Sequence, residues 1–184
     1  MKTELQVSLV LTVLVVLTRT VLHVAPNVEF VTAAGVSAGL LFKDKRIAVG
    51  TVLISLLLSD LIIGNSVIFV FTWSGFMFAP VISWLASGKI KSGRVSRLAI
   101  YGTISGIIST LFFFLWTNLG VVLTTNMYSK DVAGVMHSYL NALPFLRNQL
   151  AGNIFIVPVV ILGVYTWLRF EEQLNPARLN KAIR

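Results

Sequence analysis

The chain contains no cysteine among its 184 residues. This absence excludes disulfide bonds, thiolate metal sites and thiol nucleophiles. Charged residues are scarce as well, at 12% of the chain, whereas 56% of the residues are hydrophobic. A chain this apolar cannot cover itself with a water-compatible surface in a single folded domain. We therefore expect a protein that folds within a lipid bilayer.

The sequence also lacks the motifs of the common hydrolytic enzymes. It has no Gly-x-Ser-x-Gly elbow, no His-Glu-x-x-His pair and no phosphate-binding P-loop. Its two histidines are too far apart to form a compact metal-binding motif with the nearby carboxylates. We therefore expect no enzymatic activity, no ATPase of its own, no resident metal and no cofactor.

Six apolar runs predict an all-α, polytopic membrane bundle of about six transmembrane helices in a single domain. Each crossing of the hydrocarbon core requires about 20 mostly apolar residues, so the runs consume most of the chain. The expected spans are residues 5–24, 28–42, 47–63, 67–86, 98–123 and 151–168. The second and third runs are shorter than a usual span, so we expect them to tilt little, to extend past their polar ends, or to lie where the protein thins the bilayer.

Lysine and arginine gather in alternate connections between these runs. Basic residues precede the first run, separate the second from the third and the fourth from the fifth, and follow the sixth. The positive-inside rule places all these segments in the cytoplasm, together with both termini. The net charge of +8 therefore indicates orientation in a bacterial cytoplasmic (inner) membrane, and we expect lipid, not nucleic acid, as the partner of the basic residues.

The longest connection, residues 124–150, is expected outside the cytoplasm. Apolar residues recur in it at helical spacing, which predicts a short amphipathic helix over the outer mouth of the bundle: Val132, Val135, Met136, Tyr139, Leu140 and Leu143. Two interpretations remain open. The helix either covers a ligand or lies on the surface without one.

Polar residues gather in the outer third of the predicted bundle. An ionisable side chain within a span costs several kcal/mol unless it is paired or hydrated, which makes such residues candidates for function. We predict an outward-open pocket for a small polar ligand, formed by Arg19, His23, Asn27, Glu29, Asp60, Trp116, Asn118, Arg147 and Asn148. The alternative is a structural ion pair of Arg19 with Asp60 or Glu29.

Small residues at four-residue spacing form a second candidate feature, in the second run. Such patterns let helix backbones approach closely, as at Ala34 with Ala38 and Gly35 with Gly39. They serve either to pack the chain's own helices or to dock a partner membrane subunit.

Four segments carry a resemblance to a known family: residues 19–27, the small-residue run 33–39, Ser59-Asp60, and Thr117 to Gly120. With these segments the chain resembles an uncharacterised bacterial family of six-span proteins, which is similar to the substrate-binding S components of energy-coupling-factor (ECF) transporters. The resemblance implies a bundle that captures a vitamin or related micronutrient and passes it to a transmembrane coupling subunit with two cytoplasmic ATPases. In S components the docking pattern usually lies on the first helix, whereas here its nearest match lies on the second.

Together these features predict a substrate-binding membrane component for the uptake of a small molecule, with the ligand captured at the outer face. The alternative is a structural or assembly membrane protein that acts through helix–helix contacts, similar in size and number of spans to the rod-shape factor MreD.

Overall fold

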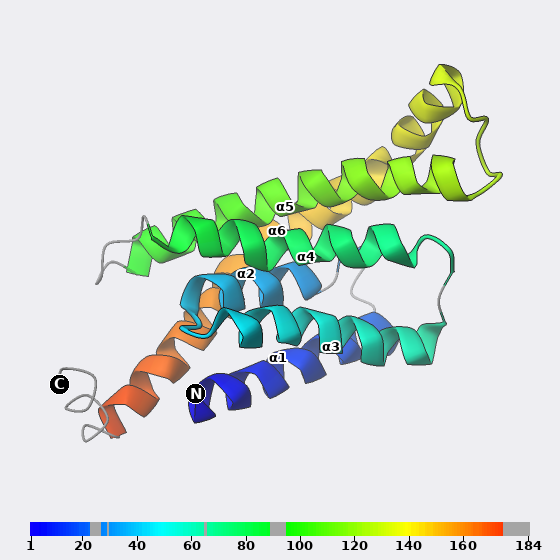
Figure 1. Cartoon of the computed structure of the whole chain (residues 1–184). Helices are drawn as coiled ribbons and strands as arrows, with labels where there is room; N and C mark the ends of the chain where they lie inside the picture. The colour runs from blue at the N-terminus through cyan, green and yellow to red at the C-terminus, as the bar shows by residue number, and fades with distance from the viewer. Residues whose placement is uncertain (23–26, 29, 65, 89–94, 175–184) are drawn as a thin grey trace.

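The computed structural model describes residues 1–22, 27–28, 30–64, 66–88 and 95–174. Within these ranges the chain is all-helical, as predicted, with six helices that form one bundle (Figure 1). They are α1 (Lys2–Thr20), α2 (Val31–Leu41), α3 (Lys45–Ile63), α4 (Phe69–Ser87), α5 (Val95–Thr124) and α6 (Val132–Leu174).

Five of these helices are long and apolar enough to cross a membrane, and α2 is the exception. At 1.5 Å per residue its 11 residues extend about 16 Å, roughly half of a hydrocarbon core. The prediction of a helical span over residues 28–42 was therefore too long, because the helix covers only Val31–Leu41. Asn27 has a φ of 60°, outside the right-handed helical region, and the helix begins only at Val31. The chain is a multi-pass membrane bundle in which the helix of one returning pass, α2, is only 11 residues long.

The first helix of the bundle begins at the same end at which the sixth helix finishes (Figure 1). The start of α1, the end of α6 and the connection between α2 and α3 share this end, which we call the terminal end. The connections from α3 to α4 and from α5 to α6 lie at the opposite end, which we call the distal end. Successive helices thus run in alternate directions, as predicted.

Helix α2 lies at the centre of the bundle. Ten of its 11 residues are buried, and it contacts each of the other five helices. At its terminal end, Glu4 of α1 accepts a 2.7 Å hydrogen bond from the backbone N–H of Lys43. The Lys45 ammonium donates to the carbonyl of Gly39 at 2.9 Å. These bonds satisfy backbone groups at the end of α2 that the helix itself leaves unpaired.

Helix α6 differs most from the prediction. The expected connection 124–150 shrinks to residues 125–131, and α6 runs unbroken for 43 residues through the predicted short helix and the predicted sixth span. Asp131 caps its first turn by accepting a 2.8 Å hydrogen bond from the Gly134 N–H. Pro144, a residue type that typically interrupts helices, lies inside α6. The helix is bent, and its first turns run at an angle to the remainder (Figure 1).

Candidate functional site

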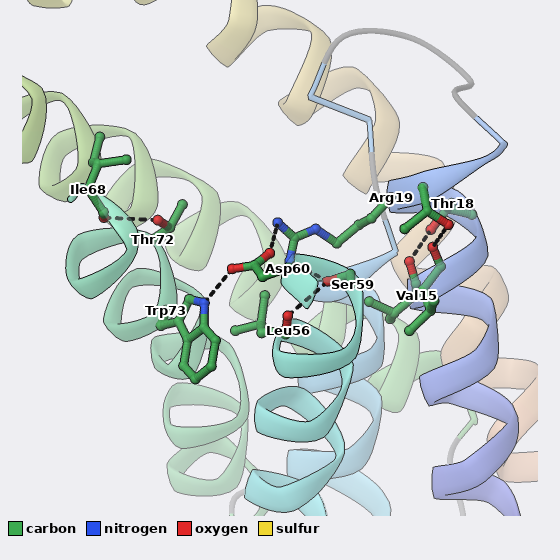
Figure 2. Close-up of polar contacts among 11 residues, drawn as sticks. Val15, Thr18, Arg19, Leu56, Ser59, Asp60, Ile68, Thr72 and Trp73 are labelled. Atoms are coloured by element: carbon green, nitrogen blue, oxygen red, sulfur yellow. Dashed lines mark hydrogen bonds and ion pairs between the residues drawn. The ribbon is translucent and has the colours of Figure 1, made fainter. Parts of the chain in front are cut away.

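An ion pair between two helices lies at the distal end of the bundle. Arg19 belongs to the last turn of α1, and Asp60 lies one turn before the end of α3. The Arg19 Nη2 and Asp60 Oδ1 atoms are 3.1 Å apart, and each side chain is only 10% exposed (Figure 2). The structure thus joins two of the predicted site residues in direct contact.

Three further side chains surround this pair. Arg19 Nη1 donates to the hydroxyl of Ser59 at 3.0 Å, and Trp73 Nε1 of α4 donates to Asp60 Oδ2 at 2.7 Å. The Arg19 guanidinium also lies 5.9 Å from the ring centroid of Phe76. Figure 2 shows that the contacts converge from three helices. The ion pair therefore fixes α1, α3 and α4 relative to one another.

The position of each charge on its helix explains why the two are paired. The carboxyl end of a helix carries partial negative charge, which favours a cation such as Arg19 and disfavours an anion such as Asp60. The positive charge of Arg19 therefore offsets the partial negative charge at the carboxyl ends of both α1 and α3. Gly64 then ends α3 with a φ of 81°, a backbone conformation that residues with a side chain rarely adopt.

An open hollow with a volume of about 430 Å³ lies beside the pair, between the end of α3 and the start of α4. Its walls combine the two charges, backbone, hydroxyl groups and one apolar side chain: Arg19, Asp60, Ile63, Gly64, Ser66 and Thr72. The Thr72 hydroxyl donates to the Ile68 carbonyl at 3.0 Å, which holds its side chain in place (Figure 2). The hollow therefore presents charged and hydroxyl groups that are already positioned.

Trp116 and Asn118, which we predicted to be part of the pocket, lie on α5 and do not line this hollow. Trp116 Nε1 donates to the hydroxyl of Ser74 at 2.8 Å, and its ring centroid lies 5.1 Å from that of Phe71. Asn118 donates to the carbonyl of Phe114 at 2.8 Å. Both side chains make contacts within α5 or between α4 and α5.

The remaining predicted residues are spread over the distal end. Arg147 is exposed and Asn148 half-buried on α6, and Asn27 is exposed before α2; none of the three lines the hollow. His23 and Glu29 lie outside the described residues. Of the nine predicted site residues, the structure therefore places Arg19 and Asp60 in the hollow.

The predicted site did not include Ser59, Trp73 and Thr72, although Ser59 belongs to one of the four segments that carry the resemblance. For Trp73 a signal was present. Residue 60 lies three residues before the end of the third run and residue 73 lies six residues after the start of the fourth, so antiparallel neighbours bring the two within about one helical turn in depth. The two hydroxyl residues gave no comparable signal, because serine and threonine are common within membrane helices.

The described part of the chain contains no group of three or more His, Asp or Glu residues that could hold a metal ion. The small residues of α2 are occupied within the bundle. Ala34, Gly35, Ala38 and Gly39 are all buried, and a Cβ atom on Gly39 would lie 2.2 Å from Ser83 Oγ and 2.3 Å from the Pro80 carbonyl oxygen. They pack the chain's own helices, which is the first of the two roles that the spacing allowed.

Comparison with curated proteins and with solved structures gives no match. A family model does match, over residues 1–177, and its description is "Family of unknown function (DUF6580)". The matched region includes all six helices and therefore the ion pair and the hollow. The chain belongs to this family.

Proposed function

We propose that this chain is a membrane-embedded binding component that receives a small polar ligand in the hollow beside Arg19 and Asp60. The observation that supports the proposal is the hollow of about 430 Å³, which opens at the distal end of the bundle beside a charged pair. Its volume lies in the range of small-molecule sites, about 300–1,000 Å³.

The contacts of the pair suit it to binding as well as to packing. Ser59, Trp73 and Phe76 hold both side chains in position, so little conformational entropy remains to be lost when a ligand binds. Both side chains retain some exposure to the hollow. A small ligand with hydrogen-bonding groups would meet an arginine donor, a carboxylate acceptor and the hydroxyl of Thr72 within one space.

Uptake is the role that we propose for this binding. The basic residues at the terminal end favour a cytoplasmic position for that end, which would leave the hollow open to the outside. The sequence has no nucleotide-binding motif, so uptake would draw energy from a separate coupling subunit with ATPases. A vitamin or related micronutrient is the substrate class that we propose.

The test uses the full-length protein purified in lipid nanodiscs. Extraction and mass spectrometry identify co-purified small molecules, and a panel of vitamins is then titrated by calorimetry. We expect Thr72→Val to weaken binding about fivefold, because one neutral hydrogen bond contributes about 1 kcal/mol. Thr124→Val is the matched control: its hydroxyl makes the same kind of bond to the carbonyl four residues earlier, but the residue does not line the hollow. A protein that carries no small molecule and binds none of the panel would contradict the proposal.

A structural or assembly role is the second candidate, and the closed contacts of the ion pair favour it. The pair joins α1, α3 and α4 through contacts among the chain's own side chains. In that case Arg19→Gln would lower the stability of the bundle without changing any binding. Under our proposal it would also abolish binding at temperatures where the variant stays folded, so both quantities should be measured on each variant.

A further inference from the structure

We propose that the first three turns of α6, residues 132–143, form an interfacial helix that lies at the distal membrane surface with one face among the lipid acyl chains. We call this part of α6 the distal segment. Its exposed side chains, its depth and its continuity with the lipid-facing surface favour this position, which does not depend on the proposed ligand.

Helix α6 is longer than one crossing of the hydrocarbon core requires. Its 43 residues extend about 64 Å at 1.5 Å per residue, about twice the thickness of a hydrocarbon core. A straight helix would project its first three turns into water. Instead, these turns point away from the direction of the rest of α6 (Figure 1), as the proline at position 144 allows.

Two hydrogen bonds fix the depth of the distal segment. The Tyr139 hydroxyl donates to the carbonyl of Leu115, and Ser138 Oγ donates to the carbonyl of Asn118. Leu115 lies 18 residues beyond Arg97 (115 − 97) along α5, which corresponds to about 27 Å. Because a charged residue such as Arg97 marks one polar boundary, this contact lies close to the other boundary of the hydrocarbon core. The segment therefore lies beside the edge of the core and not above it.

The side chains of the distal segment form three lines along the helix. The first line is buried against the bundle and consists of Gly134, Ser138 and Ala142. The second is apolar and exposed, with exposed fractions from 48% to 83%, and consists of Val132, Met136, Leu140 and Leu143. The third is also exposed and consists of Ala133, His137 and Asn141. An exposed apolar face that lies beside an exposed face with polar side chains, here His137 and Asn141, is typical of a helix in a membrane interface.

The apolar line continues the surface that α5 presents to lipid. Tyr139 lies between the buried line and the apolar line, with its ring centroid 5.6 Å from that of Phe114. The neighbouring α5 residues Leu111 and Leu115 are exposed apolar side chains, as expected of a face in contact with acyl chains. Lipid is therefore the occupant that the structure favours over a protein partner.

The absence of cysteine permits a direct test, since a single introduced cysteine is the only thiol in the protein. Met136→Cys and Leu140→Cys place an environment-sensitive fluorophore on the apolar line, and Ala133→Cys and His137→Cys place it on the third line. Each variant is studied full-length in nanodiscs, with iodide as the aqueous quencher and with doxyl-labelled phosphatidylcholine as the lipid quencher. All four positions are exposed, so the changes leave the packed core intact.

We expect blue-shifted emission and strong quenching by the doxyl lipid at positions 136 and 140, and strong quenching by iodide at positions 133 and 137. Equal quenching of all four positions by iodide would overturn the proposal, because the segment would then project into water. Protection of positions 136 and 140 from both quenchers would overturn it as well, because a second copy or a partner protein would then cover the apolar line.

Discussion

Replacement of Gly39 by alanine tests the close approach of α2 and α4. A Cβ atom at this position would lie 2.2 Å from Ser83 Oγ and 2.3 Å from the Pro80 carbonyl oxygen. Ordinary contacts between heavy atoms lie near 3.5 Å, so the two helices would have to separate by about 1 Å. Helix α2 cannot move away freely, because ten of its 11 residues are buried and it touches every other helix. We expect Gly39→Ala to lower the free energy of unfolding by about 1–3 kcal/mol, the usual range for overpacking.

Gly50→Ala provides the matched control. Gly50 lies inside α3, and a Cβ atom there would meet nothing within 4 Å. This change should raise the free energy of unfolding by about 0.5–1 kcal/mol, because alanine loses less backbone entropy in a helix than glycine does. The two variants should therefore differ by about 1.5–4 kcal/mol despite identical chemistry.

The assay is equilibrium unfolding of the detergent-solubilised protein by increasing amounts of SDS, followed by tryptophan fluorescence. A third variant, Gly39→Ala with Ser83→Ala, removes the hydroxyl contact but leaves the contact with the Pro80 backbone. We expect it to recover only part of the lost stability. If Gly39→Ala were as stable as the unmodified protein, the reasoning about helix separation would be refuted.

Three further predictions concern the distal end. Arg19→Gln and Asp60→Asn should each lower the free energy of unfolding by about 3 kcal/mol or more, because each single change leaves a buried charge unpaired. The loss in the double variant should be smaller than the sum of the two single losses by about 1–3 kcal/mol. Additive losses in the same unfolding assay would show that the pair does not act as a unit. Trp73→Phe should lower the free energy of unfolding by about 1.5–3 kcal/mol, since it removes a hydrogen bond to a carboxylate. Trp116→Phe removes a hydrogen bond to a neutral hydroxyl and should lower it by about 1 kcal/mol or less. Equal losses in the two variants would contradict the greater strength of the bond to Asp60. The Gly134 N–H and the Ser129 hydroxyl lower the pKa of Asp131 below its ordinary value of 3.8. The hydrogen bonds to the ionised Asp131 carboxylate therefore stabilise the first turn of α6 fully above pH 3.8, and this stabilisation is lost as the pH falls through the folded-state pKa. Hydrogen exchange of the Gly134 amide should accelerate in that pH range, and Asp131→Asn should abolish this pH dependence.

The overall architecture was predictable from hydropathy because apolar runs of spanning length have few alternatives to helix in a bilayer. The length of α2 was not predictable from hydropathy. The apolar residues before Val31 indicate burial, but burial does not require helix, and the positive φ of Asn27 has no signature in an apolar pattern. The continuity of α6 was missed for a related reason. Pro144, Arg147 and Asn148 are typical of a connection, yet a helix tolerates all three when neighbouring helices hold it in place.

The candidate site was predictable in part. The cost of charge within a span indicated Arg19 and Asp60 and offered their pairing as an alternative, and the structure pairs them. The size and walls of the hollow were not predictable, because they depend on the turn at Gly64 and on the angle at which α4 leaves it. Polar composition at one depth thus indicates which residues share an end of a bundle, but not which of them face the same space.

The central position of α2 has a consequence for assembly during synthesis. Helix α2 leaves the ribosome before α6, which it contacts in the finished bundle. Until α6 arrives, Val36 and Leu40, which share a core cluster with Val157 and Ile161 of α6, are in part solvated by acyl chains, which are as apolar as the α6 side chains that later replace them. Transfer of α2 from lipid to its final neighbours therefore gains little from the hydrophobic effect. The close fit of α6 against α5, where Ile161 lies over Gly102 and Val157 over Gly106, must supply the energy that commits α6 to its place.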